Sequence, residues 1–396
     1  MELMRIDALL FKALYVVEAG IVVTQVLNMD TLTSLLFFLT FPITVLLWLR
    51  SVRRTVKETD IVMCVTIAMA IISVFINASL CAGHIGFQYL RKLIMFIMTL
   101  LFFQAAHRTK ADRKMITFVN GTVDTLTAVL IVMYFVRWPQ MHIVNGQVTT
   151  YLSFRFTNPN LTALFLTCLF MLKMNRLFAK GTWYTKVIHW IMVLLLAWFV
   201  VQTQSRNCMM VMTLFTALCV WVFFSKKKDL TIRKVWAVLI AVIPGVFVMG
   251  YMALVYSPLI QKLLSFMVSE GKGLNSRVEI WKPALENIFK SPIVGAYYQI
   301  SNGTGSSQMH NNHLDIAASY GLPVLVLVCI LLIAYLYQRG RRYREKCQYI
   351  YMLGFCCTVL LGIGEAAVFA GGMGIYILAG SFLLLGNAAD PEQTVR

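Results

Sequence analysis

The sequence predicts an all-α, polytopic integral membrane protein with about twelve transmembrane helices and one large extracytoplasmic loop that carries a short amphipathic helix. Two observations support this fold class. First, 59% of the 396 residues are hydrophobic and only 13% are charged, with a mean hydropathy of +0.74, whereas a soluble domain carries roughly a quarter charged residues. Second, the hydrophobic residues form stretches close to the ~20 residues that a helix needs to cross a bilayer.

The apolar stretches give the positions of the expected helices. Backbone N–H and C=O groups must be paired inside lipid, so each stretch is expected to be a helix rather than a strand of an open sheet. We expect the twelve spans at about residues 8–27, 32–49, 61–79, 88–106, 117–136, 159–174, 186–203, 207–225, 235–256, 316–337, 348–365 and 369–386. The chain then divides into about nine spans in 1–256, a large outer loop in 257–315, and about three spans with a short cytoplasmic tail in 316–396.

Lysine and arginine are concentrated in alternate loops of this arrangement. Five loops hold 22 of the 35 basic residues, near residues 50–57, 108–114, 173–186, 226–234 and 339–346. The positive-inside rule makes their common side cytoplasmic, and both termini are expected there as well. The net charge of +18 is therefore attributed to topology, and no nucleic-acid partner is expected.

Nine cysteines are scattered through the chain, mostly inside the apolar stretches. None belongs to a CxxC motif or to a Cys/His group with the spacing of metal ligands, so we expect them to be small packing residues. There is also no DxD motif and no dense group of outer carboxylates. A metal-dependent enzyme that uses sugar nucleotides is therefore not expected, and neither a metal nor another cofactor is predicted.

The long loop is the segment that most strongly indicates function, because long connections in a bundle of short loops are usually functional. Within it, Ser276 followed three residues later by Glu279 is a capping-box pattern. Apolar residues at helical spacing follow, at Val278, Trp281, Leu285 and Ile288. We expect a short amphipathic helix over 275–289 that lies on the membrane surface.

Arg277 is expected in the first turn of that helix, where free N–H groups and the helix dipole favour anions. A cation at this position opposes the dipole, which is explained if an anion binds beside it. The alternative is an arginine that caps a loop or forms an ion pair with Glu279. The spacing alone leaves both interpretations open.

A second polar group, His310-Asn311-Asn312-His313-Leu314-Asp315, comes just before the tenth expected span. Histidine changes its charge near neutral pH, so a histidine at the membrane edge is a candidate for proton transfer. His310, His313 and Asp315 also suggest a metal site, although this spacing lacks a clear context for a third ligand. A solvated end of the loop is the simplest alternative.

Further basic residues lie on the expected outer side, against the charge trend. Arg206 is in a tight turn between two spans. Arg155 precedes the Asn158-Pro159-Asn160 segment, which structure alone explains, because asparagine caps helices and proline suits the first turn. Arg91 and Lys92 are near the outer end of the fourth span, where their side chains are expected to extend to the interface or to bind lipid phosphate.

Together these residues predict a ring of cations on the outer membrane surface with a histidine group beside it. Arginine stays charged and binds phosphate oxygens in a bidentate manner. A lipid-linked pyrophosphate at the interface is the ligand that fits such a ring.

The order of these motifs resembles the signature of the O-antigen ligase and polymerase superfamily. The signature runs through Arg277, Trp281, Pro292, Gly295, His310-Asn311 and Gly321. Members of that superfamily pair an amphipathic segment with arginine and tryptophan, in a large periplasmic loop, with a His-Asn pair before the next span. The Ser205-Arg206 turn and the 155–160 segment resemble two further landmarks. The resemblance covers roughly residues 150–340, and the first five spans match only in hydropathy.

This resemblance implies a bacterial surface-polysaccharide glycosyltransferase in the plasma membrane, with its active site on the periplasmic or extracellular side. It implies transfer of a glycan from undecaprenyl pyrophosphate to an acceptor hydroxyl, with inversion and without a metal. Carried onto this chain, the catalytic residues are Arg206 and Arg277, which hold the pyrophosphate, and His310, which acts as general base or positions the acceptor. The expected substrate-binding residues are Arg155, Asn160, Trp281, Asn311, His313 and Arg91. Trp281 is expected to anchor the surface helix, and the presence of His313 leaves open which histidine acts.

Two activities of the superfamily share this chemistry. A polymerase, which we favour on base rates, extends a lipid-linked repeat unit of O-antigen, capsule or exopolysaccharide. A ligase attaches finished glycan to the lipid A core or to protein. The expected partners are the lipid-linked donor, a glycan, lipid or protein acceptor, membrane lipid, and a flippase or chain-length regulator.

A transporter or lipid flippase is the alternative from another functional class. Transporters carry ionisable residues in mid-membrane along the path of the substrate. Glu18 and Asp124 are the main candidates here, and the sequence shows no obvious partner for either. Paired broken helices in matching halves of the chain, which are typical of transporters, are not apparent.

Overall fold

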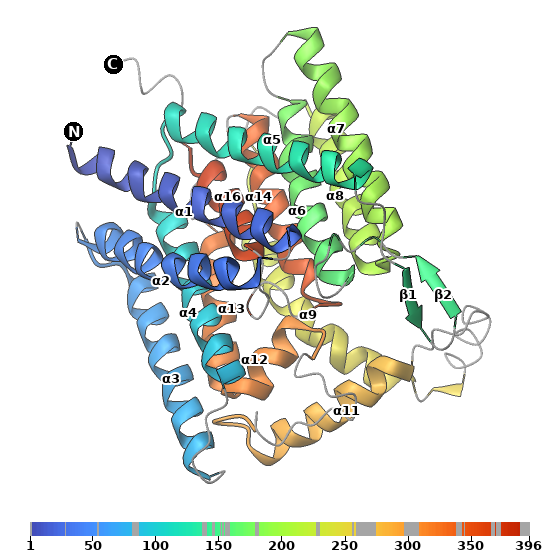
Figure 1. The fold of residues 1–396 in the computed structure, drawn as a ribbon. Helices are drawn as coiled ribbons and strands as arrows, with labels where there is room; N and C mark the ends of the chain where they lie inside the picture. Colours follow the sequence, from blue (N-terminus) through green and yellow to red (C-terminus); the bar gives the residue numbers. More distant parts are fainter. Residues whose placement is uncertain are drawn as a thin grey trace.

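The computed structural model of the chain is a bundle of helices with one short β-hairpin (Figure 1). It describes residues 2–27, 29–53, 55–80, 87–136, 141–144, 147–150, 152, 154, 159–178, 182–226, 230–255, 257–258, 275–296, 309–337, 343, 345–365, 369 and 374–388. The first helices are α1 (Glu2–Val26), α2 (Asp30–Val52), α3 (Glu58–Leu80), α4 (Phe87–Arg108), α5 (Arg113–Val136), α6 (Pro159–Arg176), α7 (Trp183–Gln202), α8 (Arg206–Phe224) and α9 (Lys234–Val255). They are followed by α11 (Asn275–Lys290), α12 (Asn312–Tyr320), α13 (Leu322–Leu336), α14 (Lys346–Leu361) and α16 (Ile375–Gly386).

Helices lie in all twelve apolar stretches that the sequence marks as spans. Within the described residues, seven helices are long and apolar enough to cross a membrane, namely α2, α3, α4, α5, α7, α8 and α9. The helices α13, α14 and α16 are apolar but shorter. The all-α class and the polytopic membrane character are thus confirmed, while the count of twelve spans stays a prediction.

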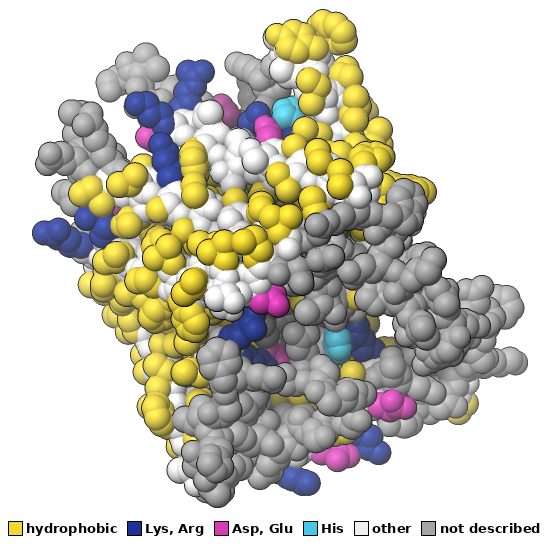
Figure 2. All heavy atoms as spheres, in the orientation of Figure 1, with side chains coloured by type: hydrophobic (Ala, Val, Ile, Leu, Met, Phe, Trp, Pro, Cys, Tyr) yellow, Lys and Arg dark blue, Asp and Glu magenta, His cyan; other side chains and the backbone are white. Residues whose placement is uncertain are grey.

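Three helices form the centre of the bundle. The helices α6, α14 and α16 are buried along nearly all of their length, as is typical of helices that are enclosed by others. By contrast, α2, α7 and α9 expose many large hydrophobic side chains, and hydrophobic side chains cover much of the face shown in Figure 2. Lipid is the solvent that suits so much exposed apolar surface.

The tenth expected span is divided into two helices, α12 and α13, instead of one helix over 316–337. The break is at Gly321, whose φ is +91°. A Cβ atom on this residue would lie 2.0 Å from the carbonyl oxygen of Ile293, so only glycine permits the close approach of the two backbones. The N–H of Leu322 donates to the carbonyl oxygen of Pro292 at 2.8 Å. The segment after α11 is therefore packed against the break.

The β-hairpin lies in the loop before α6, where no strand is expected from the sequence. Its strands, β1 (Met141–Val144) and β2 (Gln147–Thr150), pair antiparallel, with Met141 opposite Thr150. Strands of four residues are too short for an alternating pattern to stand out. The Asn-Gly pair between them in the sequence is the turn signal that indicates a hairpin.

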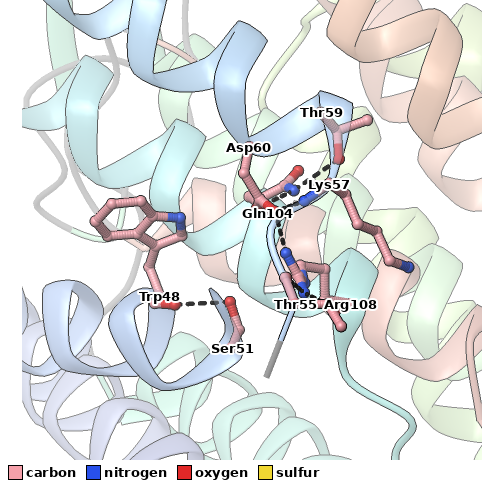
Figure 3. A network of polar contacts seen from close by, with 8 residues as sticks. All are labelled: Trp48, Ser51, Thr55, Lys57, Thr59, Asp60, Gln104 and Arg108. Carbon is pink, nitrogen blue, oxygen red and sulfur yellow. Dashed lines mark hydrogen bonds and ion pairs between the residues drawn. The ribbon is translucent and has the colours of Figure 1, made fainter. Parts of the chain in front are cut away.

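A buried carboxylate joins the first two basic loops. Asp60, near the start of α3, forms an ion pair with Arg108 at the end of α4 (Figure 3). Gln104 donates to Oδ1 of Asp60 at 2.6 Å. Arg108 also donates to the carbonyl oxygen of Thr55. These two loops therefore lie on the same side of the molecule.

The other three basic loops meet on this side as well. Nδ2 of Asn175 donates to the carbonyl oxygen of Cys347 at 3.0 Å, and a backbone bridge joins the fourth basic loop to the fifth. After α16, Nδ2 of Asn387 donates to the carbonyl oxygen of His107 at 2.8 Å. Nε2 of Gln348 donates to the carbonyl oxygen of Ala388 at 3.1 Å. In Figure 2, one group of lysine and arginine side chains lies towards the region where Figure 1 marks both chain ends, and others lie in the lower half of the view. The basic loops thus share one end of the bundle, as the positive-inside arrangement requires.

Candidate functional site

The turn over 362–365, which follows α14, is the centre of the candidate site. Nδ2 of Asn207, at the start of α8, donates to the carbonyl oxygen of Leu361 at 2.9 Å. The backbone N–H of Asn312, at the start of α12, donates to the carbonyl oxygen of Gly362 at 2.9 Å. A Cβ atom on Gly362 would lie 2.4 Å from Nδ2 of Asn312. The starts of α8 and α12 are therefore packed closely against one turn.

Asn311 ties this turn to α9 and α12. It is fully buried, and its side-chain oxygen caps α12 by accepting from the N–H groups of His313 and Leu314, at 3.0 Å each. Its Nδ2 donates to the carbonyl oxygens of Pro244 at 2.9 Å and Ile363 at 3.0 Å. Both donors and the acceptor of the amide are thus used within the protein.

His310 is presented to the turn by an uncommon backbone conformation. Its φ is +50°, in the left-handed region that residues other than glycine rarely adopt and that is often found at functional sites. Nδ1 of His310 lies 2.8 Å from Oε2 of Glu365, the last residue of the turn. The side chain of Glu365 is 3% exposed and that of His310 is 16% exposed. One ring nitrogen thus contacts a buried carboxylate while the ring stays accessible.

Arg277 contacts the same carboxylate. It lies in the first turn of α11, as the sequence predicts, and its Nη2 is 3.1 Å from Oε1 of Glu365. Arg277 therefore pairs with Glu365 rather than with Glu279, whose side chain is exposed. Nη1 of Arg277 is buried and has no hydrogen-bond partner within the described residues. A buried donor without a partner is costly, and an anionic ligand would satisfy it.

Glu365 thus joins Arg277 and His310, two residues that the sequence motifs indicate. No motif in the sequence indicates Glu365 itself. Its two partners are 55 and 88 residues away along the chain. One signal that could have found it is a carboxylate at the end of an apolar stretch, because ionisable residues at such positions are usually functional. The glycines at 362 and 364, which shape the turn before it, are a second signal.

The helix α11 is held against the bundle by a face that overlaps the expected one only in part. It packs on α9 and α12, so protein contacts decide which side chains are covered. Nε1 of Trp281 donates to the carbonyl oxygen of Met309 at 2.9 Å, and the indole packs edge-on against Tyr251 with ring centroids 5.3 Å apart. Val278 and Leu285 are only partly buried. The buried residues are Ile280, Trp281, Ala284 and Ile288.

His313 and Asp315 contact other parts of the protein. Nε2 of His313 lies 2.7 Å from the carbonyl oxygen of Ala241 and 3.4 Å from Sγ of Cys329. Asp315 forms an ion pair with Lys92 at 2.8 Å. Lys92 is therefore paired inside the protein and does not extend to the interface as the sequence suggested. The described part of the chain contains no group of three His, Cys, Asp or Glu residues that could hold a metal.

The remaining predicted site residues lie on other elements. The guanidinium of Arg91 is 5.6 Å from the centre of the Phe37 ring, on α2, within the range of a cation–π contact. Asn160 is partly buried in the first turn of α6. Arg155 lies outside the described residues, as does most of the long loop over 257–315.

Three helices begin beside the turn. Arg206, the first residue of α8, is exposed and directly precedes the asparagine that holds the turn. The helix α11 begins two residues before Arg277, and α12 begins at Asn312. Helix N-termini carry partial positive charge that attracts anions. Together with the two arginines, these ends make the surroundings of the buried carboxylate electropositive.

Residues 191–329 match the family model described as O-antigen ligase. Over this range, which is less than half of the chain, the sequence is similar to O-antigen ligases. The range contains Arg206, Arg277 and His310, and the resemblance drawn from the sequence motifs is confirmed. No curated protein matches the chain. The match supports, in general terms, a surface-polysaccharide enzyme of the ligase and polymerase type.

The candidate site extends beyond the matched range. Glu365 follows the end of that range, and Lys92, which pairs with Asp315, precedes its start. Segments from outside the family pattern thus complete the environment of the family motifs.

The two carboxylates that suggested a transporter both have partners, contrary to the expectation from the sequence. The hydroxyl of Tyr376 donates to Oε1 of Glu18 at 3.0 Å. Nζ of Lys173 forms an ion pair with Asp124 at 2.6 Å and lies 3.0 Å from Nδ1 of His189. Each carboxylate thus joins two helices of the bundle, which favours a structural role for both.

Proposed function

We propose that this protein is a metal-independent membrane glycosyltransferase. It transfers a glycan from undecaprenyl pyrophosphate to an acceptor hydroxyl at the outer face of the bacterial plasma membrane, and it acts as a repeat-unit polymerase. The observation that carries the proposal is the position of Arg277 and His310. These two residues of the family motifs contact opposite oxygens of one buried carboxylate, that of Glu365.

The side of the membrane is argued from the ends of the helices. The helices α8 and α14 each have one end at the basic loops and the other at the turn that holds Glu365. In Figure 1, α11 lies at the lower edge, far from both chain ends. With the basic loops in the cytoplasm, the site faces the outer side.

The donor pyrophosphate is held by two arginines. Nη1 of Arg277 is a buried donor without a partner in the described residues, and Arg206 is exposed at the start of α8. Guanidinium groups match phosphate oxygens in geometry and charge. Negative charge grows on the pyrophosphate as its bond to the sugar breaks, and cations held in place stabilise that charge.

The acceptor is activated by His310. The acceptor oxygen attacks the anomeric carbon, its proton passes to the imidazole, and the bond from the anomeric carbon to the pyrophosphate oxygen breaks. Undecaprenyl pyrophosphate then leaves. A positioned general base contributes about 10²–10⁴-fold to such a step. Attack from the face opposite the leaving group inverts the configuration of the sugar.

The identity of the acceptor distinguishes two activities. We favour a polymerase, because superfamily members that serve capsule and exopolysaccharide pathways are diverse, and its acceptor is a second lipid-linked repeat unit. A ligase, with the lipid A core or a protein as acceptor, is the alternative. In either case the partners are the lipid-linked donor, the acceptor and membrane lipid, and a flippase or a chain-length regulator is a candidate protein partner.

The test is complementation of a strain that lacks the protein. Arg206→Ala, Arg277→Ala and His310→Ala are compared with wild type, and Lys282→Ala, exposed on α11, is the matched control. Surface polysaccharide and lipid-linked intermediates are resolved by gel, and membrane abundance is measured by immunoblot. We expect the three variants to reach the membrane and to lower polysaccharide synthesis by about 100-fold or more, whereas the control stays normal.

Each outcome identifies one interpretation. Single lipid-linked repeat units that remain unextended support the polymerase. Full-length lipid-linked glycan that is never attached would show a ligase instead. Normal polysaccharide from all three variants would overturn the proposed site and favour the transporter.

A further inference from the structure

We propose that Glu365 is a positioning residue of the transfer reaction. It holds the imidazole of His310 in the tautomer that leaves Nε2 free to take the acceptor proton. This inference rests on the proposed function and adds a residue to the same site. Glu365 lies outside the range that matches the family, 191–329, and belongs to none of the sequence motifs.

The tautomer follows from the contact at Nδ1. An ionised carboxylate only accepts hydrogen bonds, so the 2.8 Å contact between Nδ1 of His310 and Oε2 of Glu365 places the proton on Nδ1. Nε2 of the neutral ring then carries the lone pair. A histidine whose other nitrogen donates to a carboxylate is oriented to act as a general base.

Glu365 is held in place well enough to orient the ring. Its side chain is 3% exposed, and the carbonyls of the turn before it are bonded by Asn207, Asn311 and Asn312. Arg277 supplies the opposite charge at its other oxygen. A buried charge that is paired in this way costs far less than an isolated one.

The same carboxylate sets the direction of the arginine. Nη2 of Arg277 bonds to Glu365, while Nη1 is the buried donor that the described residues leave unpaired. The guanidinium therefore keeps one nitrogen for the carboxylate and one for a phosphate oxygen. Donor binding does not need to displace Glu365, so the base stays oriented when both substrates are bound.

The role of Glu365 in the step is electrostatic as well as geometric. As the acceptor oxygen bonds to the anomeric carbon and the bond to pyrophosphate breaks, the acceptor proton moves to Nε2 of His310. The ring becomes an imidazolium, and its new positive charge faces the carboxylate. Nε2 then releases the proton to water. Glu365 keeps its charge throughout and takes up no proton itself.

A double-substitution cycle on the full-length protein tests this role. Glu365→Gln keeps the size of the side chain, but its amide can donate to Nδ1 and so stabilise the opposite tautomer. Glu365→Asp keeps the charge. Each is made alone and together with His310→Ala, and Glu279→Gln, which removes an exposed carboxylate on α11, is the matched control. Turnover is measured with lipid-linked glycan extracted from the deletion strain.

We expect Glu365→Gln to lower kcat by about 10²–10⁴-fold, while KM for the donor lipid changes less than about threefold. Glu365→Asp should retain more activity than Glu365→Gln, because the charge matters more than the length. In the His310→Ala background, Glu365→Gln should lower the rate by less than about threefold, since the imidazole is gone and the amide oxygen of the glutamine still accepts from Arg277. A purely structural carboxylate would give the same loss in both backgrounds.

The failures are distinguishable. Full activity of Glu365→Gln, or an equal fold loss with and without His310, overturns the inference and leaves the proposed function standing. Full activity of His310→Ala overturns the proposed function itself. If Glu365→Gln does not accumulate in the membrane, Glu365→Asp is compared alone and in the His310→Ala background. An equal fold loss of activity in the two backgrounds overturns the inference. A smaller fold loss in the His310→Ala background supports it.

Discussion

Two residues organise the site by directional bonds rather than by packing. Asn311 uses every hydrogen-bonding group of its amide to join α9, α12 and the turn after α14. Glu365 joins α11 to the segment before α12. Both side chains are buried, where a lost partner is not replaced by water. Their removal therefore leaves unsatisfied polar groups inside the protein.

Asn311→Ala is expected to destabilise the protein by about 2–4 kcal/mol, because it removes a helix cap and two further hydrogen bonds. Thermal unfolding of the purified protein in detergent measures the effect. Thr213→Ala is the control, since its hydroxyl is exposed and bonds only within α8, and it is expected to change stability by less than about 0.5 kcal/mol. An unchanged unfolding temperature for Asn311→Ala would show that the hydrogen bonds of Asn311 to α9, to α12 and to the turn after α14 do not stabilise the protein.

The sequence indicates which single residues are candidates for the site, but it does not indicate the pairs that they form. The arginine and histidine beside the amphipathic segment predict phosphate binding and proton transfer, and these roles stay predictions. Which carboxylate they meet depends on tertiary contacts, and Lys92 and Asp315 are 223 residues apart. His310 and His313 look alike in the sequence. In the structure, His310 contacts a carboxylate and His313 a backbone carbonyl.

At the scale of elements, apolar length and capping signals placed the helices well. The helix expected over 275–289 is observed as Asn275–Lys290. Its buried face was predicted only in part, because periodicity shows that a face exists and the neighbouring helices decide which side chains it contains. The division of the tenth span was missed because hydropathy is continuous across it. Gly321 and Pro323 are the breaking signals.

Gly321→Ala is expected to reduce the amount of folded protein strongly. The new methyl group would meet the carbonyl oxygen of Ile293 at 2.0 Å, and φ of +91° is unfavourable for alanine. Membrane abundance and thermal unfolding measure the effect. Gly250→Ala is the control, because nothing lies within 4 Å of the added atom and alanine stabilises a helix by about 0.5–1 kcal/mol. Normal abundance of Gly321→Ala would contradict the close approach at the break.

At the scale of the whole molecule, the distribution of lysine and arginine anticipated an arrangement that the contacts support. All five basic loops meet at one end of the bundle, and the site lies at the other ends of α8 and α14. The number of basic residues in a loop predicts its side of the membrane, but it does not predict which other loop it contacts. The network around Asp60 and the bridge between the fourth and fifth basic loops therefore appear only in the structure.

Single cysteines at exposed positions test this orientation. Glu279→Cys, on α11, is expected to react with a membrane-impermeant maleimide on spheroplasts, and Arg233→Cys, in the fourth basic loop, is expected to react only after the membrane is opened. Both positions are exposed, so a difference in labelling reports the side of the membrane. The unsubstituted protein gives the background from its native cysteines. Labelling of Arg233→Cys on intact spheroplasts would reverse the proposed topology.

The ion pair between Lys92 and Asp315 has a consequence for exchanging parts between related enzymes. Asp315 belongs to the matched segment, and its side chain is 3% exposed. Lys92 is on α4, and its side chain is 10% exposed. A chimera that transplants only the family segment into another scaffold would bury an uncompensated carboxylate, which costs roughly 3–5 kcal/mol. The matched segment therefore cannot be transferred to another protein by itself. A graft has to bring the lysine of α4 and the glutamate after α14 with it.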